Sequence, residues 1–371
     1  MHVGIDSHNA EREGEGNATY SRGLISALLA AGGDDEFTLF AADPDHPFYR
    51  GLSASGRWQR RRVGQRMGVA RLGWALGRAA ARERVDVLHA QYAAPLGYGG
   101  PLVITVHDLG FVHVPESFSL PLRVALRVLV PRGMARAARI ITASEFARRD
   151  IVARYAIAPG KIEVIPLGAD ARFRPLPVTE SGQVLARYGL EPGFLFSLGR
   201  LNRRKNLERL LLAYGRLRRA GALAAPLVIG GKPDHGVDAV LRRARLSHDA
   251  GHVRFAGLIP DADLPAFYSA AACFVYPSLF EGFGLPLLEA MACGAPVVSS
   301  NRAALPELVG EAGLEVDPEN VDALAGAIAR IVGDRGLARE LGQRGLERSR
   351  RYSWAETARR TLHVYRQVAP S

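Results

Sequence analysis

Short segments rich in β-branched and other apolar residues alternate with helix-like segments along the whole chain, and no other feature restricts the possible folds as strongly. The segment 102–107, Leu-Val-Ile-Thr-Val-His, is one of them. Strands that are apolar on both faces must be covered on both faces, so their alternation with helices predicts parallel α/β sheets. We expect strands at 2–6, 37–41, 85–89, 102–107, 140–143 and 162–166, and then at 194–198, 226–229, 253–255, 273–276 and 296–299.

The strand–helix pattern stops once and restarts, which indicates two domains. A chain of 371 residues exceeds the usual size of a single domain. The segment 171–177, Ala-Arg-Phe-Arg-Pro-Leu-Pro, is proline-rich and irregular, as is typical of a linker. We expect one Rossmann-like domain at 1–172, a second at 183–352, and a C-terminal helix within 353–371 that packs back on the first domain.

The formal net charge of +11 is compatible with nucleic acid, an anionic membrane or phosphorylated substrates as partners. The segment 57–62, Arg-Trp-Gln-Arg-Arg-Arg, mixes cations with an aromatic residue. No recognised nucleic-acid motif accompanies it, so nucleic-acid binding is the less favoured alternative. Cys273 and Cys293 lie among small apolar residues, which predicts buried, reduced thiols. We find no secretory signal and no run of about 18 apolar residues, which predicts a cytoplasmic location.

The segment 281–289, Glu-Gly-Phe-Gly-Leu-Pro-Leu-Leu-Glu, combines features of a ligand site. Its proline suits the first turn of a helix, so a helix is predicted from near Gly284 through residue 292. The first amides of this helix, near Gly284 and Leu285, can bind an anion. Gly282 and Gly284 allow the backbone to approach a ligand closely.

The two glutamates of this segment are expected to have different roles. Glu281 precedes the helix, where it is free to accept hydrogen bonds from sugar hydroxyls. Glu289 lies inside the helix, where it can reach ribose hydroxyls. Carboxylates are good bidentate acceptors for such diols. Gly282 and Phe283 complete the predicted contact with the sugar.

The loop at 199–206, Gly-Arg-Leu-Asn-Arg-Arg-Lys-Asn, directly follows a predicted strand. Strand-end loops that open a helix are where α/β folds bind ligands. Arg200 offers a planar fork and Lys205 a point charge to a diphosphate. Lys205 is one of three lysines in a chain whose usual cation is arginine. Arg203 and Arg204 are expected at the surface.

Glu281 through Glu289 and the segments around them resemble the E-x7-E signature of retaining GT-B glycosyltransferases of the GT4 family. This resemblance covers nearly the whole chain. It implies two Rossmann-like parallel-sheet domains facing each other across a cleft, the first for the acceptor and the second for a nucleotide sugar. It assigns Arg200 and Lys205 to the donor diphosphate, and His107 to the reacting sugar. Asp108 would orient His107 or its loop.

Four further residues are candidates of the same resemblance. Gly14 and Gly16 follow the first strand, where the family has a loop near the acceptor or diphosphate, although Glu15 departs from the family's usual form. Ser144 matches a segment at the cleft and is equally suited to be a helix N-cap. Leu258 would contact the base through its backbone.

The resemblance implies transfer of a hexose with retention to a glycan, lipid-linked or small-molecule acceptor. The segments 107–111 and 144–150 resemble bacterial mannosyltransferases of polysaccharide assembly, so GDP-mannose is the expected donor and a UDP-hexose the alternative. A GT-B epimerase or phosphorylase is less favoured, because the E-x7-E pattern indicates transfer and no lysine context for pyridoxal phosphate is visible.

Neither a metal nor another cofactor is expected. Asp43-Pro44-Asp45 and Asp261-Ala262-Asp263 match the D-x-D metal motif formally, but we interpret them as a turn and a helix N-terminus. Arg200, Lys205 and the helix N-terminus already supply positive charge for a diphosphate.

Two basic segments predict docking on an anionic membrane surface. Arginines cluster beside Trp58 and Met67, at positions Arg57, Arg60, Arg61, Arg62 and Arg66. A helix at 122–138 would place Arg123 and Arg127 on one face and crowd Leu122, Leu126 and Leu129 on another. Interfacial helices combine cations with an apolar face in this way. The protein is therefore predicted to be peripheral on the inner face of the cell membrane.

Overall fold

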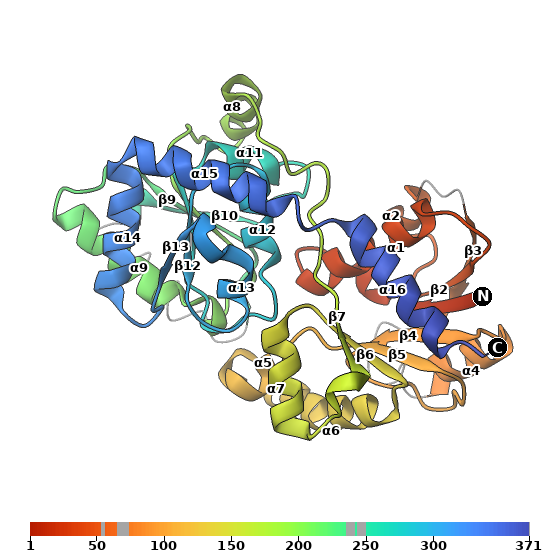
Figure 1. The fold of residues 1–371 in the computed structure, drawn as a ribbon. Helices are drawn as coiled ribbons and strands as arrows, with labels where there is room; N and C mark the ends of the chain where they lie inside the picture. Colours follow the sequence, from red (N-terminus) through yellow and green to blue (C-terminus); the bar gives the residue numbers. More distant parts are fainter. Residues whose placement is uncertain (53–55, 65–73, 235–241, 243–249, 371) are drawn as a thin grey trace. The chain divides into compact units, whose positions relative to one another are not determined.

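The structure, a computed structural model, describes residues 1–52, 56–64, 74–234, 242 and 250–370. They form two compact α/β units (Figure 1). The first unit comprises Met1–Val112, Leu120–Gly168 and Ser353–Ser371, and the second comprises His113–Ser119 and Ala169–Tyr352. The last segment of the chain therefore belongs to the unit with which the chain begins.

The first unit contains a parallel sheet of seven strands in the order β3-β2-β1-β4-β5-β6-β7, which confirms the predicted sheet type. Because β1, β4 and β5 are consecutive parallel strands of this sheet, their carboxyl ends lie side by side. The strands are β1 (His2–Asp6), β2 (Glu36–Ala41), β3 (Arg57–Arg62), β4 (Val87–Gln91), β5 (Leu102–Thr105), β6 (Arg139–Thr142) and β7 (Ile162–Val164).

Strand β3 was not predicted, because its sequence is basic rather than apolar. It pairs with β2 at the border of the sheet, where only one side needs a hydrogen-bonding partner. Arg61 donates to Glu83 at 2.6 Å, and Arg62 lies 3.9 Å from Asp43. The predicted basic cluster is thus an edge strand with partly neutralised charge, and Arg66 and Met67 lie outside the described residues.

The second unit contains a parallel sheet of six strands in the order β10-β9-β8-β11-β12-β13. Helices α9 and α14 contribute to one hydrophobic core with strands of this sheet. Strand β13 was not predicted, because its exposed Glu315 interrupts the apolar pattern. The strands are β8 (Leu195–Leu198), β9 (Leu227–Gly230), β10 (Val253–Gly257), β11 (Cys273–Tyr276), β12 (Val297–Ser300) and β13 (Leu314–Val316).

Helices follow most strands, as the alternating sequence predicts. Both cysteines are buried and free, as predicted. The helices are α1 (Gly16–Ala30), α2 (Pro47–Arg50), α4 (Leu76–Arg82), α5 (Gly110–His113), α6 (Leu120–Arg136), α7 (Glu145–Tyr155), α8 (Val178–Ala186), α9 (Leu207–Arg219), α11 (Leu264–Ala270), α12 (Leu285–Ala292), α13 (Leu305–Val309), α14 (Val321–Gly333), α15 (Arg335–Ser349) and α16 (Trp354–Val368).

The C-terminal helix α16 packs beside α1 in the first unit (Figure 1). The Tyr365 hydroxyl forms a buried hydrogen bond of 2.5 Å with Nδ1 of His89 in β4. Burial lowers the pKa of His89 to about 3, so this ring stays neutral. Gly23 of α1 leaves space for the Trp354 ring, since a Cβ at Gly23 would lie 2.2 Å from it.

Helix α6 differs from the prediction in which side chains it exposes. Leu122 is 49% exposed, but Leu126 and Leu129, which were predicted to share its face, are half-buried. The other large hydrophobic residues exposed on α6 lie four residues apart and therefore form a stripe along the helix. They are Leu120, Val124 and Val128. Within the described part of the chain, no helix is both long and apolar enough to cross a membrane.

We predict that Gly23→Ala destabilises the first unit. The added methyl group would collide with the Trp354 ring, and overpacking of this kind costs about 1–3 kcal/mol. Urea denaturation would measure the loss in the free energy of unfolding. Gly182→Ala in α8 is the control, because nothing lies within 4 Å of a Cβ there, and this variant should be neutral or slightly more stable. Equal stabilities for the two variants would contradict the packing of α16 on α1.

Candidate functional site

Two loops of the second unit carry the predicted donor-binding residues. One follows β8 and contains Arg200 and Lys205, and the other follows β11 and begins the approach to α12. Strands β8 and β11 are parallel neighbours, with Cys273 in register with Leu195. Their loops therefore leave the sheet side by side, at the edge where α/β folds bind ligands.

A buried ion pair joins these two loops. Nζ of Lys205 donates to Oε1 of Glu281 at 2.6 Å and to the hydroxyl of Tyr276 at 2.5 Å. Arg204 adds a second cation, 3.4 Å from the other carboxylate oxygen. One expectation is therefore wrong: Arg204 is not a surface residue, because it helps the buried carboxylate to remain charged inside the protein. Glu281 is held by these partners rather than projecting without contacts from its loop. Arg203, in contrast, is exposed as predicted.

The two glutamates have opposite ionisation. Burial alone would raise the pKa of Glu281, but the charges of Arg204 and Lys205 outweigh it and lower the pKa to about 2. Burial raises the pKa of Glu289 to about 8, although a hydrogen bond of 2.9 Å from Tyr268 opposes the shift. At neutral pH the first group is a carboxylate and the second is mostly a neutral acid. Environments that separate two such pKa values are typical of functional sites.

The helix predicted after Glu281 is α12, with Gly284 just before its first residue, Leu285. Gly284 has φ 110°, and a Cβ there would lie 2.7 Å from Leu305, so only glycine fits. Within the described ranges, the amides of Gly284 and Leu285 donate no hydrogen bond to the protein. They are therefore available to an anion. Gly282 and Phe283 are buried, and Phe283 packs against Tyr352.

Arg200 is 45% exposed and pairs with Asp234 at 3.2 Å. Asp234 also accepts a hydrogen bond of 3.2 Å from Asn202, so it fixes the loop at two points. Asp234, which follows β9, was not predicted from the sequence, where its only signal is a position after a strand. Gly199 has φ 152°, and a Cβ there would lie 2.7 Å from the Lys205 side chain.

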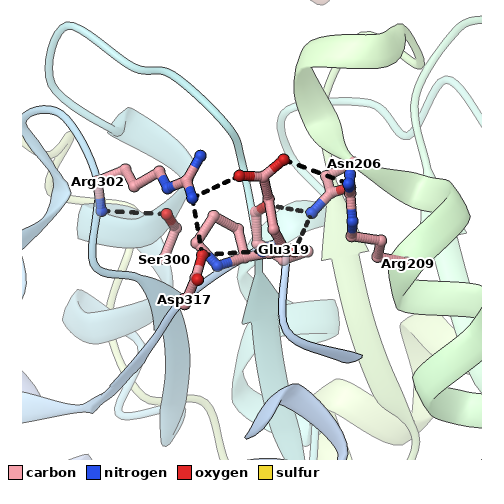
Figure 2. A network of polar contacts seen from close by, with 8 residues as sticks. Asn206, Arg209, Ser300, Arg302, Asp317 and Glu319 are labelled. Carbon is pink, nitrogen blue, oxygen red and sulfur yellow. Dashed lines mark hydrogen bonds and ion pairs between the residues drawn. The ribbon is translucent and has the colours of Figure 1, made fainter. Parts of the chain in front are cut away.

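Asn206, which was also not predicted to have a role, anchors the same loop from the other end. It lies at φ 56°, a conformation that asparagine tolerates better than most residues. Its amide nitrogen donates to the carbonyls of Pro277 and Pro318 at 3.1 and 2.6 Å. Figure 2 shows how a chain of ion pairs extends this anchor across the surface of the unit. The chain consists of Arg209, Glu319, Arg302 and Asp317.

His107 and Asp108 lie in the first unit, two and three residues after the end of β5. Nε2 of His107 lies 3.1 Å from Oε1 of Gln91, the last residue of β4. Burial lowers the pKa of His107 to about 4, so the ring is neutral at neutral pH. Asp108 accepts a hydrogen bond of 2.8 Å from the amide of Gly110, so its side chain stabilises the loop between β5 and α5. Gln91 was not singled out in the sequence.

The other residues predicted to line the site lie in separate loops and helix starts of the two units. Gly14 has φ 69°, and Gly16 is the first residue of α1, with open space around it. Ser144 is the N-cap of α7, where its hydroxyl accepts from the amide of Ala147 at 3.1 Å. Leu258 is half-buried and directly follows β10 in the second unit.

The two D-x-D segments are a turn and a helix start. In the first, the amide of Asp45 donates to the side chain of Asp43. In the second, Asp263 rather than Asp261 precedes α11, and it binds Arg187 at 2.6 Å. Outside the undescribed segments, no group of three or more His, Cys, Asp or Glu side chains is arranged to hold a metal ion.

Comparisons of the sequence identify relatives for both halves. Residues 15–173 match the model described as Glycosyltransferase Family 4, and residues 187–348 match Glycosyl transferases group 1. O-antigen chain mannosyltransferase B of Escherichia coli is 34% identical over 71% of this chain and 70% of its own length. Serotype-specific mannosyltransferase WbdA of Escherichia coli is 32% identical over 64% of this chain, which spans only 29% of that longer protein.

Solved structures share the fold over nearly the full chain. Sucrose-phosphate synthase from Thermosynechococcus elongatus superposes with a TM-score of 0.77 at 26% identity, covering 99% of this chain and 98% of that one. Anabaena HepE in complex with UDP and glucose has a TM-score of 0.75 at 19% identity, covering 99% of each chain. The predicted GT-B fold, as two parallel-sheet α/β domains, is thus confirmed.

We predict that Glu289 makes the protein less stable as the pH rises. Its pKa of about 8 in the folded state exceeds its ordinary value of 4.5, so between these values unfolding releases a proton. The wild type should lose stability across this range and lose no more above it. Glu289→Gln cannot ionise, so its Tm relative to the wild type should rise from about pH 5 to about pH 8 and then level off.

Thermal melts at several pH values would measure this difference. Glu347→Gln, a change of an exposed glutamate in α15, is the matched control and should follow the wild type at every pH. A constant difference between Glu289→Gln and the wild type would show that Glu289 ionises normally.

Proposed function

Because this chain belongs to the GT-B glycosyltransferases, we propose that it moves mannose from GDP-mannose to a hydroxyl of a glycan, with retention of configuration. Glycosyl transfer is the reaction of the family. The mannosyl donor is supported by the two Escherichia coli relatives, whose names are mannosyltransferases. A UDP-hexose is the alternative donor, since the base would meet mainly backbone atoms near Leu258.

The buried pair of Lys205 and Glu281 is the observation that carries this proposal. Breaking the bond between sugar and diphosphate builds negative charge on the departing diphosphate. Lys205 and the exposed fork of Arg200 supply fixed positive charge for it, and the amides of Gly284 and Leu285 add hydrogen bonds. Glu281, ionised at neutral pH, would accept hydrogen bonds from sugar hydroxyls beside the same lysine.

We further propose that transfer needs neither a metal nor another cofactor. In this scheme the positive charge that a metal would supply comes from Arg200, Lys205 and the start of α12. His107 would contact the reacting sugar as a neutral group, and Glu289 the ribose. Glu281 would bind the sugar rather than serve as a covalent nucleophile, so departure and attack would take place on one face of the sugar.

We predict that Arg200→Ala weakens GDP binding and transfer, with EDTA present throughout. A charged hydrogen bond contributes about 1.5–3 kcal/mol, which corresponds to roughly 10- to 100-fold in affinity. Calorimetric titration with GDP would measure the binding, and release of GDP from GDP-mannose would measure the turnover. Arg203→Ala, a neighbouring exposed arginine of the same loop, should change neither by more than about twofold.

Three outcomes would count against parts of this scheme. Equal GDP affinity in the Arg200 and Arg203 variants would remove Arg200 from the diphosphate site. Turnover that disappears in EDTA and returns with Mg²⁺ or Mn²⁺ would overturn metal independence. Turnover with UDP-hexoses but not with GDP-mannose would replace the donor.

A second part of the proposal is that α6 docks on an anionic membrane to reach a lipid-linked acceptor. The helix has no acidic residue and four arginines, which are Arg123, Arg127, Arg132 and Arg136. Its exposed stripe of Leu120, Val124 and Val128 lies between Arg127 on one side and Arg132 on the other, given 100° per residue. This combination suits the interface of a cytoplasmic leaflet, where each cation contributes about 1 kcal/mol. The arginines of β3 fit it less well, because acidic side chains pair with them.

We predict that the protein co-sediments with vesicles containing anionic phosphatidylglycerol, and that salt weakens this binding. Replacing Val124 and Val128 by Ser should reduce the bound fraction, and so should replacing Arg127 and Arg132 by Ser. The control carries Arg335→Ser and Arg339→Ser in α15 of the second unit, which lowers the charge equally without touching α6. Absence of binding at low salt, or equal losses in the control, would contradict docking through α6.

A further inference from the structure

We propose that Gln91 is a positioning residue that fixes the ring plane and the tautomer of His107, so that Nδ1 of His107 accepts a hydrogen bond from a sugar hydroxyl. This inference rests on the proposed function, in which a sugar contacts His107. It adds a residue outside every motif described above. It also states which ring nitrogen meets the substrate and in which protonation state.

The register of two parallel strands places Gln91 beside His107. Gln91 ends β4 and is paired with Thr105, the last residue of β5. His107 follows two residues later, so it projects from the same edge of the sheet. Oε1 of Gln91 and Nε2 of His107 are 3.1 Å apart. Because a carbonyl oxygen only accepts, the hydrogen of the neutral ring lies on Nε2.

Gln91 is itself held in place from the other side. Its amide nitrogen donates to the hydroxyl of Ser21, a buried residue of α1, at 2.7 Å. Ser21 thereby orients the amide so that its oxygen faces His107. The Tyr20 ring meets the His107 ring edge-on with centroids 4.5 Å apart, and the Tyr92 ring lies 5.7 Å away. The aromatic rings thus restrict the position of the imidazole, and one hydrogen bond fixes the direction in which its Nε2 points.

This arrangement leaves Nδ1 of His107 as an acceptor. No hydrogen bond to Nδ1 exists within the described residues, and a neutral ring with its hydrogen on Nε2 has a lone pair there. The titratable groups that face or adjoin the ring are Tyr20, Tyr92, His89 and Asp108. None of them is a carboxylate bonded to Nε2, and burial favours the neutral ring. Protonation of Nδ1 would turn this acceptor into a donor.

Gln91→Glu tests the inference, because it keeps the shape of the side chain and places a negative charge beside Nε2. A carboxylate neighbour raises the pKa of a histidine by about 1–3 units, so His107 would become protonated at mildly acidic pH. We expect kcat/KM of Gln91→Glu, divided by that of the wild type, to fall about tenfold from pH 8.5 to pH 5.5. Taking the ratio removes the effect of other titrating groups such as Glu289. A ratio that does not change with pH would overturn the inference.

The chain offers a matched control in Gln367→Glu. Nε2 atoms of Gln367 and His363 lie 2.9 Å apart on the exposed face of α16, so this variant also places a carboxylate beside a histidine, but away from the candidate site. Its ratio to the wild type should stay constant with pH. Thermal melts of both variants would show whether Gln91→Glu is folded at each pH.

Nitrogen-15 NMR of histidine-labelled protein tests the same inference without any substrate. His107→Gln identifies the His107 signals by their disappearance. We expect the hydrogen on Nε2 in the wild type and a mixture of tautomers in Gln91→Met, which cannot hydrogen-bond the ring in the same way. A hydrogen on Nδ1 in the wild type, or a single Nε2 tautomer in Gln91→Met, would overturn the inference. Because this measurement needs no donor, its outcome is separate from failure of the proposed function.

Discussion

The ion pair between Lys205 and Glu281 holds together the two loops on which the candidate donor site depends. A carboxylate buried as deeply as Glu281 would be costly without a partner, and here it has two cations and a tyrosine hydroxyl. The pair can form because β8 and β11 are parallel neighbours whose loops leave the same edge. Asn206 and Asp234 then fix the ends of the Lys205 loop, so the lysine does not have to be ordered by a ligand.

The same constraint explains why two glutamates of one short segment behave differently. Glu281 lies in a loop where cations surround it, so the charged form is favoured. Glu289 lies inside α12 against Tyr268, where burial dominates and the neutral form is favoured. A ligand diol near Glu289 would therefore meet a group that can both donate and accept. Folding thus gives different ionisation states to two residues of the same type.

Around β4 and β5, the interior of the first unit relies on hydrogen bonds between neutral polar groups. His89, Thr105, Tyr20 and Tyr365 form a buried chain of hydrogen bonds between β4, β5, α1 and α16. Burial keeps both His89 and His107 uncharged, so these two rings contribute hydrogen-bonding capacity without a charge of their own. Helix α16 completes this network, although it is the last element of the chain.

The sequence by itself determined the fold class, most strands and the start of α12 near Gly284, and it singled out Arg200, Lys205, Glu281 and Glu289 as candidates for donor binding. These features depend on local patterns, namely apolar runs, a helix-start proline and glycines. It did not reveal β3 or β13, whose polar residues are tolerated at sheet borders. Nor did it reveal the partners Arg204, Asn206, Asp234 and Gln91. Only the tertiary structure decided those contacts and the opposite ionisation of the two glutamates, because register between distant strands and burial, rather than sequence spacing, set which side chains meet and which charges persist.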